Sequence, residues 1–259
     1  MPRRIRRGLI FGRAIHRAFQ QYRRKFAKRK RPPTLEERAE WLHHASKGCL
    51  DALGVKVGLQ GEIPTDGLVV SNHLSYLDVL TIASLAPCIF VSKADVKSWP
   101  VFGRLATNGG TIFVKRESKT DAHRVARELE DALRSGVRVV LFPEGTSSDG
   151  EKVLRFHAPL FEAAVRANAK ITPSALLYEM RDGDPARDIC YWGDMTFGTH
   201  FISLLKKTGI QARVLLGNPK AGYSDRKQAG AELWCEVAEL HRRLREEMRT
   251  MKKSGIVGK

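Results

Sequence analysis

The sequence predicts an α/β fold, with a mostly parallel mixed sheet flanked by helices. Three observations support this prediction. Short runs rich in Val, Ile and Leu alternate along the chain with longer helical patterns, the order that builds strand–helix–strand units. The strongest run, Val137–Phe142, is almost wholly apolar, as a strand covered on both faces should be. The 259 residues are also enough to bury a sizeable core without disulfide bonds.

The first element is predicted to be a basic amphipathic helix over residues 3–30. Apolar side chains share one face of it, and Arg and Lys fill most of the other positions. The apolar set is Ile5, Leu9, Ile15, Phe19, Tyr22 and Phe26. Residues 1–31 hold 13 of the 45 basic residues and no acidic one, so most of the net charge of +17 lies here. Pro32 and Pro33 end the element.

Four interpretations of this basic helix are open: a membrane-surface helix, a nucleic-acid arm, an organellar transit peptide, or a helix packed on its own domain. Transit peptides are rich in serine, whereas the first serine here is Ser46. Interleaved aliphatic and aromatic residues favour a membrane surface with anionic lipids over nucleic acid, which is not expected as a partner. Residues 1–33 are therefore predicted to associate with a membrane, and 34–259 to form a single α/β domain.

The expected location is peripheral, at the cytoplasmic face of a membrane. No apolar run approaches the roughly 18–20 residues that span a bilayer, and Arg and Gln interrupt every apolar cluster where a signal peptide would need one. The four cysteines have no C-x-x-C spacing, which argues against a zinc ribbon or a disulfide framework.

The elements after the prolines follow in order. Thr34 and Glu37 have the spacing of a capping box at the start of a helix that ends at Gly54. Strands are then predicted at 55–59, 68–71, 88–92, 111–114, 137–142, 171–177 and 212–216. Helices are predicted at 79–85, 99–106, 119–135, 158–168 and 226–250, with a long irregular stretch between the last two strands.

Unusual residues follow three of these strands, at the carboxyl ends where open α/β sheets form their sites. Asn72-His73 follows the strand at 68–71, Lys115-Arg116 follows the strand at 111–114, and Pro143-Glu144-Gly145-Thr146 follows the strand at 137–142. We expect the three groups to meet at one rim of the sheet.

His73 and Asp78 are the candidate catalytic pair. Ser75 is predicted to be the N-cap of the next helix, with Asp78 as the acidic partner of a capping box. His73 then precedes the helix and can fold back onto Asp78. A carboxylate that accepts from one ring nitrogen leaves the other nitrogen to accept a proton. The alternative is an ordinary capped helix that follows a loop histidine.

The other two groups suggest substrate binding. Glu144 can accept hydrogen bonds from hydroxyls, Gly145 permits a tight turn, and Thr146 can donate to an anion. Arg116 suits bidentate phosphate recognition, and Lys115 supplies a second charge. No metal-ligand spacing, P-loop or Gly-x-Ser-x-Gly elbow is present, which favours direct transfer over a covalent acyl-enzyme.

With these motifs, the chain resembles the 1-acylglycerol-3-phosphate acyltransferase family of glycerolipid acyltransferases. Residues 72–78 match its N-H-x-x-x-x-D block and 142–146 its F-P-E-G-T block. Residues 110–116 resemble its second block, with Arg116 at the phosphate position, and 171–173 its looser fourth. The family's usual Arg after E-G-T is Ser147 here, so Lys115, Lys152 or Arg155 are candidates to replace it.

The resemblance implies an enzyme that moves a fatty acyl group from acyl-CoA or acyl carrier protein to the hydroxyl of a lysolipid, without a cofactor. Its default acceptor is lysophosphatidic acid, with lyso-ornithine lipid as an alternative. His73 would be the base and Asp78 its partner, and Ser75 would lie beside the bound substrate. A rival hypothesis is a non-enzymatic membrane-binding protein. His157 and His200 are interpreted as surface or packed side chains, since neither has an acidic partner at a telling spacing.

Overall fold

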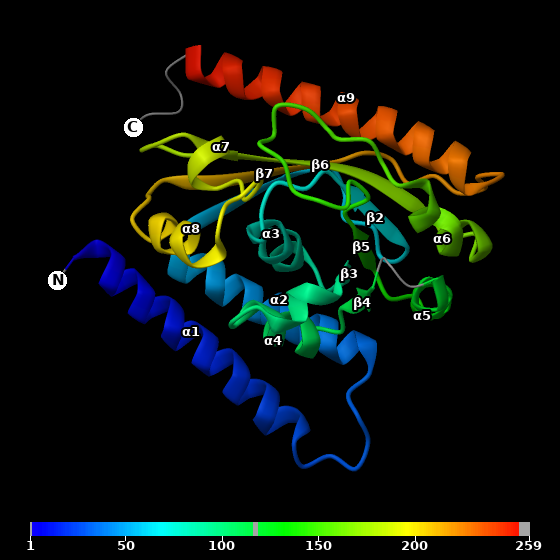
Figure 1. Cartoon of the computed structure of the whole chain (residues 1–259), viewed down its shortest axis with the longest axis horizontal. Helices are drawn as coiled ribbons and strands as arrows, with labels where there is room; N and C mark the ends of the chain where they lie inside the picture. The colour runs from blue at the N-terminus through cyan, green and yellow to red at the C-terminus, as the bar shows by residue number, and fades with distance from the viewer. Residues whose placement is uncertain (1, 116–118, 254–259) are drawn as a thin grey trace.

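A computed structural model describes residues 2–115 and 119–253 of the chain. Within these residues a seven-stranded sheet is covered by helices on both faces (Figure 1). The strands are β1 (Val55–Gln60), β2 (Leu68–Ser71), β3 (Ile89–Lys93), β4 (Ile112–Val114), β5 (Val139–Leu141), β6 (Ile171–Glu179) and β7 (Ile210–Leu216). The α-helices are α1 (Arg3–Phe26), α2 (Leu35–Leu53), α3 (Leu77–Leu85), α4 (Phe102–Asn108), α5 (Lys119–Arg134), α6 (Glu162–Arg166), α7 (Pro185–Asp188), α8 (Phe197–Leu204) and α9 (Arg226–Lys253). The predicted fold class is confirmed.

The strand order is β1-β7-β6-β2-β5-β3-β4, and every neighbouring pair is parallel except β6 with β7. In the middle of the sheet, Val70 of β2 pairs with Leu141 of β5 and with Pro173 of β6. The carboxyl ends of β2 and β5 therefore meet at one edge. This register brings the segment after Ser71 beside the turn that follows Leu141.

Two apolar cores lie on the two faces of the sheet, because successive strand side chains point to opposite sides. Val69 and Val140 face the core shared with α1, α2 and α3, whereas Leu68 and Val139 face the core shared with α5, α6 and the first half of α9. β2 and β5 are thus covered on both faces, which explains the continuous apolar run that predicted β5.

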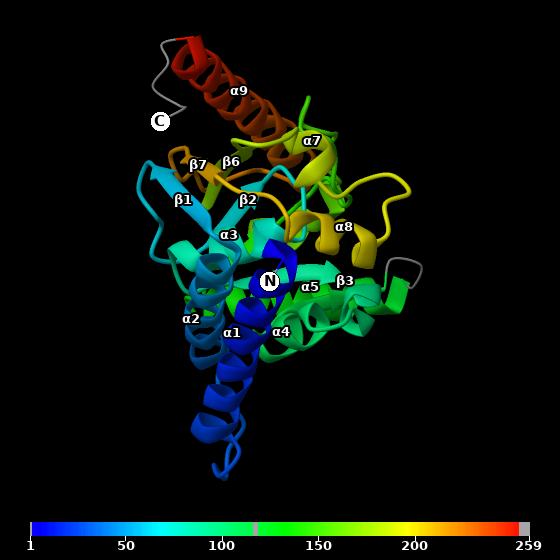
Figure 2. The same cartoon turned by 90° about the vertical axis from the view of Figure 1, so that its left-hand side faces the viewer.

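α1 packs along α2 (Figures 1 and 2). Four of its apolar side chains are buried: Phe11, Ile15, Ala18 and Phe26. The indole N–H of Trp41 on α2 donates to the Ala18 carbonyl at 2.9 Å. Most of the apolar face of α1 is therefore used inside the molecule, which bears out the interpretation of a helix packed on its own domain. Its role at a membrane stays a prediction.

α2 begins and ends as its sequence predicts. The Thr34 side chain accepts from the Glu37 backbone N–H, and the Glu37 carboxylate accepts from the Thr34 N–H, which completes the capping box. Gly54 ends the helix in the left-handed conformation, with φ 62°.

The long stretch predicted to be irregular contains two short helices, α7 and α8, so that prediction was wrong. Pro185 occupies the first turn of α7, where no backbone N–H is needed. The Asp184 side chain caps this helix by accepting from the Ala186 N–H at 3.0 Å. The predicted helix at 158–168 is also divided, into a 3₁₀ turn at Ala158–Phe161 and α6.

Across the described ranges, none of the helices combines the length and the hydropathy needed to cross a bilayer.

Candidate active site

His73 and Asp78 are in direct contact at the edge of the sheet. His73 Nδ1 lies 2.7 Å from Asp78 Oδ2, and the Asp78 side chain is wholly buried, whereas 22% of the His73 side chain is exposed. The contact forms because His73 precedes α3 and Asp78 lies in its first turn. The carboxylate holds Nδ1 and leaves Nε2 as the nitrogen that can accept a proton.

Asp78 is also fixed by the backbone around it. Its Oδ2 accepts from the N–H groups of Leu74 at 2.6 Å and Ser75 at 2.9 Å. The predicted capping box is therefore half formed: the carboxylate reaches the Ser75 N–H, but the Ser75 hydroxyl accepts from Leu77 at 3.4 Å instead of from Asp78. Tyr76, not Ser75, is the N-cap of α3, and Ser75 is buried.

Tyr178 on β6 completes the surroundings of the carboxylate. Its hydroxyl donates to Asp78 Oδ1 at 2.8 Å and lies 3.3 Å from the Thr81 hydroxyl. Sequence reasoning missed this residue, because a tyrosine in an apolar strand looks like any core side chain. Its position, four residues beyond the last β6 residue that pairs with β2, is known only once the strands are aligned.

The turn after β5 forms hydrogen bonds to both the N–H and the carbonyl group of His73. Glu144 Oε1 accepts from the His73 N–H at 3.2 Å, and the Ser148 N–H donates to the His73 carbonyl at 3.0 Å. The tight turn depends on Gly145, whose φ is 70° and whose N–H donates to the Phe142 carbonyl. The two blocks of the sequence motif thus form one hydrogen-bonded unit.

Glu144 is buried, with 3% of its surface exposed. Burial is the main cause that raises its pKa to about 8; the negative charge of Asp78 adds to this, and the backbone N–H groups of His73 and Leu154 oppose it. The Glu144 side chain therefore holds the turn after β5 in place. The neighbouring Gly145, Thr146 and Ser147 line a cavity beside His73.

Asn72 links the end of β2 to β6. Its side-chain amide donates to the Leu176 carbonyl at 3.0 Å, and its oxygen accepts from the Leu176 N–H at 2.8 Å. These two bonds replace the strand ladder that stops at Ser71, and they set the direction in which the chain leaves the sheet toward His73.

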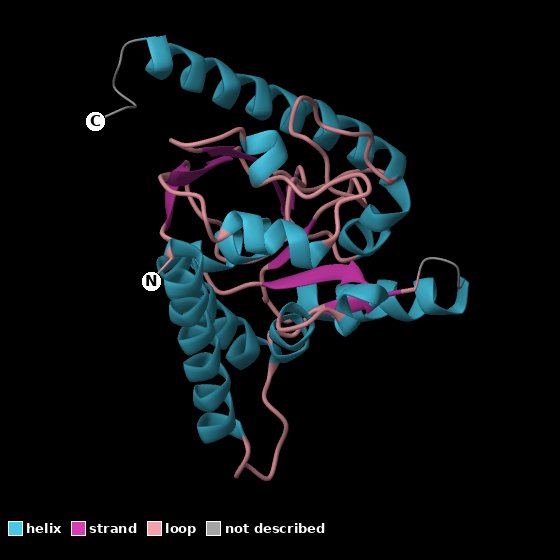
Figure 3. Cartoon of the chain, turned by 60° about the vertical axis from the view of Figure 1, so that its left-hand side comes forward, coloured by secondary structure: helices cyan, strands magenta, loops and turns pink. Residues whose placement is uncertain are grey.

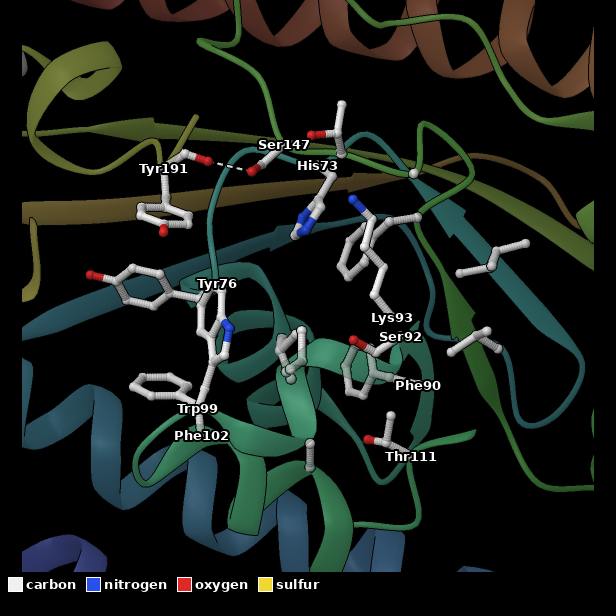
Figure 4. Close-up of a pocket in the computed structure, with 18 of the residues that line it drawn as sticks. His73, Tyr76, Phe90, Ser92, Lys93, Trp99, Phe102, Thr111, Ser147 and Tyr191 are labelled. Carbon is white, nitrogen blue, oxygen red and sulfur yellow. Dashed lines mark hydrogen bonds between the residues drawn. The ribbon is translucent and has the colours of Figure 1, made fainter. Parts of the chain in front are cut away.

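A cavity of about 270 Å³ opens beside the His73 ring (Figure 4). The ring stacks on Phe142, with centroids 4.3 Å apart, and points into this space. Most of the wall is apolar: Leu42, Tyr76, Val79, Leu80, Phe90, Val91, Val96, Trp99, Phe102, Leu105, Ala106, Val114, Leu141, Phe142, Leu160, Tyr191 and Trp192. Such a cavity suits a hydrocarbon chain that ends next to a basic imidazole nitrogen.

Of the predicted cations within the described residues, none lines this cavity. Arg116 lies outside the described residues. Lys115 is exposed, and its backbone N–H donates to Asp121 at 2.6 Å. Arg155 lies over the ring of Trp234, 4.7 Å from its centroid, and Lys152 is exposed. Among the described lining residues, Lys93 at the end of β3 carries the single ammonium or guanidinium group, which sequence reasoning missed.

His157 and His200 lie where the sequence suggested. His157 is exposed. His200 is buried, its Nδ1 lies 2.9 Å from the Tyr76 hydroxyl, and burial lowers its pKa. It belongs to an aromatic cluster that joins α8 to the cavity wall through Tyr76, Phe102 and Phe197.

Comparison with known proteins finds acyltransferases. A family model described as Acyltransferase matches residues 54–177. The chain is 34% identical to a lyso-ornithine lipid O-acyltransferase of Rhodobacter capsulatus over 198 residues, which cover 73% of this chain and 71% of that protein. It is 40% identical over 135 residues to a 1-acyl-sn-glycerol-3-phosphate acyltransferase of Neisseria gonorrhoeae, covering 51% of this chain and 53% of the relative.

The chain thus spans about half the length of that second relative. Its fold is similar to the crystal structure of the 1-acyl-sn-glycerophosphate (LPA) acyltransferase PlsC from Thermotoga maritima, with a TM-score of 0.63, 19% identity, and coverage of 94% of this chain and 98% of the other.

Proposed function

The chain belongs to the acyltransferase family, and from this premise we propose that it transfers a fatty acyl group from an acyl thioester to the free hydroxyl of a lysolipid. The observation that carries the proposal is the His73–Asp78 pair at the mouth of an apolar cavity. A base beside a hydrocarbon-sized space is what this reaction needs.

In the proposed reaction His73 Nε2 takes the proton of the acceptor hydroxyl as that oxygen attacks the thioester carbonyl carbon. The buried Asp78 carboxylate holds the ring orientation and stabilises the imidazolium that forms. The carbon–sulfur bond then breaks, and the imidazolium returns its proton to the departing thiolate. The ester therefore forms without a covalent acyl-enzyme intermediate.

The acyl chain of the donor would occupy the apolar cavity, since burying it there removes hydrocarbon from water. Acyl-CoA and acyl carrier protein both present such a thioester and are the candidate donors. Thr146 and the backbone at Gly145 would contact the acceptor, and Arg116 and Lys115 keep their predicted role at its anionic group. Lys93 adds a cation on the cavity wall itself.

Lysophosphatidic acid is the proposed acceptor, and lyso-ornithine lipid is the second candidate. Ser147 favours the second: this uncharged residue stands where the family's arginine would contact phosphate, and its hydroxyl donates to the Tyr191 carbonyl. The greater coverage of the lyso-ornithine lipid O-acyltransferase also favours it. Both lipids reside in membranes, and we propose that the basic α1 holds the enzyme on a surface that contains anionic lipids.

The test is an acyl-transfer assay with radiolabelled acyl-CoA or acyl carrier protein and each lysolipid in turn, in detergent. We expect the wild type to acylate one acceptor class and His73→Ala to lose turnover by about 10²- to 10⁴-fold, as removal of a general base does. His157→Ala, at an exposed histidine, is the matched control and should keep full activity. Turnover that survives in His73→Ala would contradict the mechanism; absence of turnover in the wild type with every pair would favour the non-enzymatic alternative.

A further inference from the structure

The loop between α7 and α8 supplies a part of the cavity wall that the proposed reaction leaves without a role. Tyr191, Trp192 and Gly193 of this loop line the cavity (Figure 3 shows the loops in pink). We call residues 191–193 the α7–α8 segment. Tyr191 lies 44 positions after Ser147 in the chain, yet the two residues are hydrogen-bonded. Tertiary contacts therefore place this segment beside the active site, and those contacts indicate what it does.

The backbone of Tyr191 is hydrogen-bonded to both halves of the active site. Its N–H donates at 2.7 Å to the carbonyl of Leu74, on the loop that carries the proposed base. Its carbonyl accepts from the hydroxyl of Ser147, on the turn after β5 (Figure 4). One residue further on, the indole N–H of Trp192 donates to the Ala186 carbonyl of α7 at 2.9 Å. These three bonds fix the position of the α7–α8 segment relative to the proposed base.

The α7–α8 segment has a packed side and an open side. The Tyr191 ring packs inward, with its centroid 5.6 Å from those of Tyr76 and Trp99. Trp192, by contrast, has 39% of its surface exposed. A methyl group added at Gly193 would meet no atom within 4 Å apart from its chain neighbours. The outer end of this wall therefore leaves room for a ligand.

The two ends of the cavity suit different parts of the reaction. Thr111 lies away from His73, whereas Ser147 and Tyr191 lie on the His73 side (Figure 4). In the proposed reaction the acyl chain of the donor extends toward Thr111, because most of the wall is apolar. The acceptor hydroxyl must reach Nε2 of His73, so the polar head of the acceptor lies at the other end. That end exposes Thr146, whose hydroxyl can donate to a polar lipid head or accept from it.

We propose that the α7–α8 segment bounds the subsite for the polar head of the lysolipid acceptor, and that Ser147 is the positioning residue that holds this segment beside His73. The proposal rests on the acyl transfer proposed above and names the part of the chain that receives the acceptor. Ser147 acts through the Tyr191 carbonyl and needs no charge for this role. The role is the same for lysophosphatidic acid and for lyso-ornithine lipid, since the hydrogen-bonded wall fixes the position of the head and not its charge.

Steady-state kinetics in detergent, with each substrate varied in turn, test the role of Ser147. Ser147→Ala removes one hydrogen bond that holds the segment, so the KM for the acceptor should rise roughly 3- to 10-fold while the KM for the donor stays unchanged. Ser147→Thr keeps a hydroxyl and should restore the wild-type KM. Ser135→Ala is the matched control and should change neither KM. The Ser135 hydroxyl also donates to a backbone carbonyl, that of Ala132 at 2.8 Å, and Ser135 is not among the described residues that line the cavity.

Hydrogen–deuterium exchange of the full chain tests the same proposal without turnover. Ser147→Ala should speed exchange of the Tyr191 amide, which donates to Leu74, by about threefold or more, whereas Ser135→Ala should not. Lysophosphatidic acid or lyso-ornithine lipid alone should slow exchange across residues 191–193 in the wild type, and coenzyme A alone should not.

Three results would overturn the proposal: protection of residues 191–193 by coenzyme A or by neither lysolipid, an equal rise of both KM values in Ser147→Ala, or unchanged exchange in that variant. Because exchange requires no turnover, these results are separable from failure of the proposed reaction, which the detergent assay of His73→Ala reports.

Discussion

Asp78 is the residue on which the geometry of His73 depends. One of its oxygens accepts from the imidazole and from two backbone N–H groups, and the other accepts from Tyr178. A buried carboxylate is stable only when hydrogen bonds replace its lost hydration, and these four donors supply that replacement. The same bonds hold the carboxylate in one orientation. The imidazole that it contacts is therefore already oriented in the free protein.

We predict that Tyr178→Phe lowers kcat while it leaves the KM for the acceptor unchanged. The hydroxyl touches Asp78 and no part of the cavity wall, so its loss loosens the carboxylate without removing a substrate contact. A hydrogen bond to a charged group contributes about 1.5–3 kcal/mol, which corresponds to roughly a 10- to 100-fold fall in kcat. Steady-state kinetics measure it. Tyr223→Phe, at a buried tyrosine in the core on the other face of the sheet, is the matched control; equal losses in both variants would refute the assignment.

Glu144 allows a second prediction at this scale. Its folded pKa of about 8 lies above the ordinary value of 4.5, so between these pH values the folded protein holds a proton that the unfolded chain releases. Stability should therefore fall as pH rises from about 4.5 to 8, by at most about 5 kcal/mol. Glu144→Gln should remove that part of the fall, and urea titrations at pH 5 and pH 8 measure it. Glu36→Gln, at an exposed glutamate, should keep the wild-type dependence.

The same variant separates two roles of Glu144. A glutamine oxygen can still accept from the His73 N–H, so Glu144→Gln should keep turnover within a few-fold of wild type, whereas Glu144→Ala should lose most of it. A large rise in the KM for the acceptor in Glu144→Gln would show instead that the carboxylate contacts the substrate, as the sequence alone suggested.

At the scale of elements, α9 supports the segment that follows the turn hydrogen-bonded to His73. The ring of His241 lies with Nε2 3.1 Å from the Gly150 carbonyl, and Arg245 donates to the same carbonyl at 3.3 Å. Gly150 packs against Leu74, directly after His73: a methyl group added at Gly150 would lie 3.2 Å from the Leu74 side chain. Among the described residues, α9 contributes none to the cavity wall, yet it holds the loop that carries His73 in place.

His241 makes this support sensitive to acid. Burial is the main cause that lowers its pKa to about 4, and the charge of Arg245 adds to it. Below pH 6.5 the unfolded chain takes up a proton that the folded protein refuses, so stability should fall as pH drops from about 6.5 to 4, by at most about 3 kcal/mol. His241→Gln, which can still donate to Gly150, should flatten this fall in urea titrations. His123→Gln, at an exposed histidine, should change nothing.

At the scale of the whole molecule, residues from several separate elements line the cavity. β3, the 3₁₀ turn at Ala94–Ser98, α4 and the loop at 191–193 all contribute to its wall, and α2 contributes Leu42. Thr111 lies at the side of this space away from His73 in Figure 4. In the proposed reaction, the span between these two residues limits the length of the acyl chain that the cavity accepts.

We predict that Thr111→Phe shifts the donor preference toward shorter acyl chains. One methylene in an apolar pocket changes discrimination by about 10- to 200-fold, so the ratio of kcat/KM between long and short donors should fall by at least about tenfold. Competition assays with donors of graded length measure this ratio. Thr111→Val, which keeps the volume and removes the hydroxyl, is the control. An unchanged preference in Thr111→Phe would show that the acyl chain lies elsewhere.

The sequence by itself determined the order and type of most elements, since the period of apolar residues and the cap residues are local signals. The capping box of α2, the strand at 68–71 and the pairing of His73 with Asp78 all depend on residues within a few positions of each other. The same local reasoning failed for α7, which begins with Asp184 and Pro185, and for α8, whose first residue has no side-chain cap.

Only the tertiary structure decided which distant residues complete the site. Tyr178 meets Asp78 across 100 positions, Glu144 meets the His73 backbone across 71, and α9 reaches the same loop from the end of the chain. The apolar face of α1 was visible in the sequence, but its burial against α2 was not. An amphipathic pattern predicts that one face of a helix is buried. Which surface covers that face depends on the packing of the whole chain.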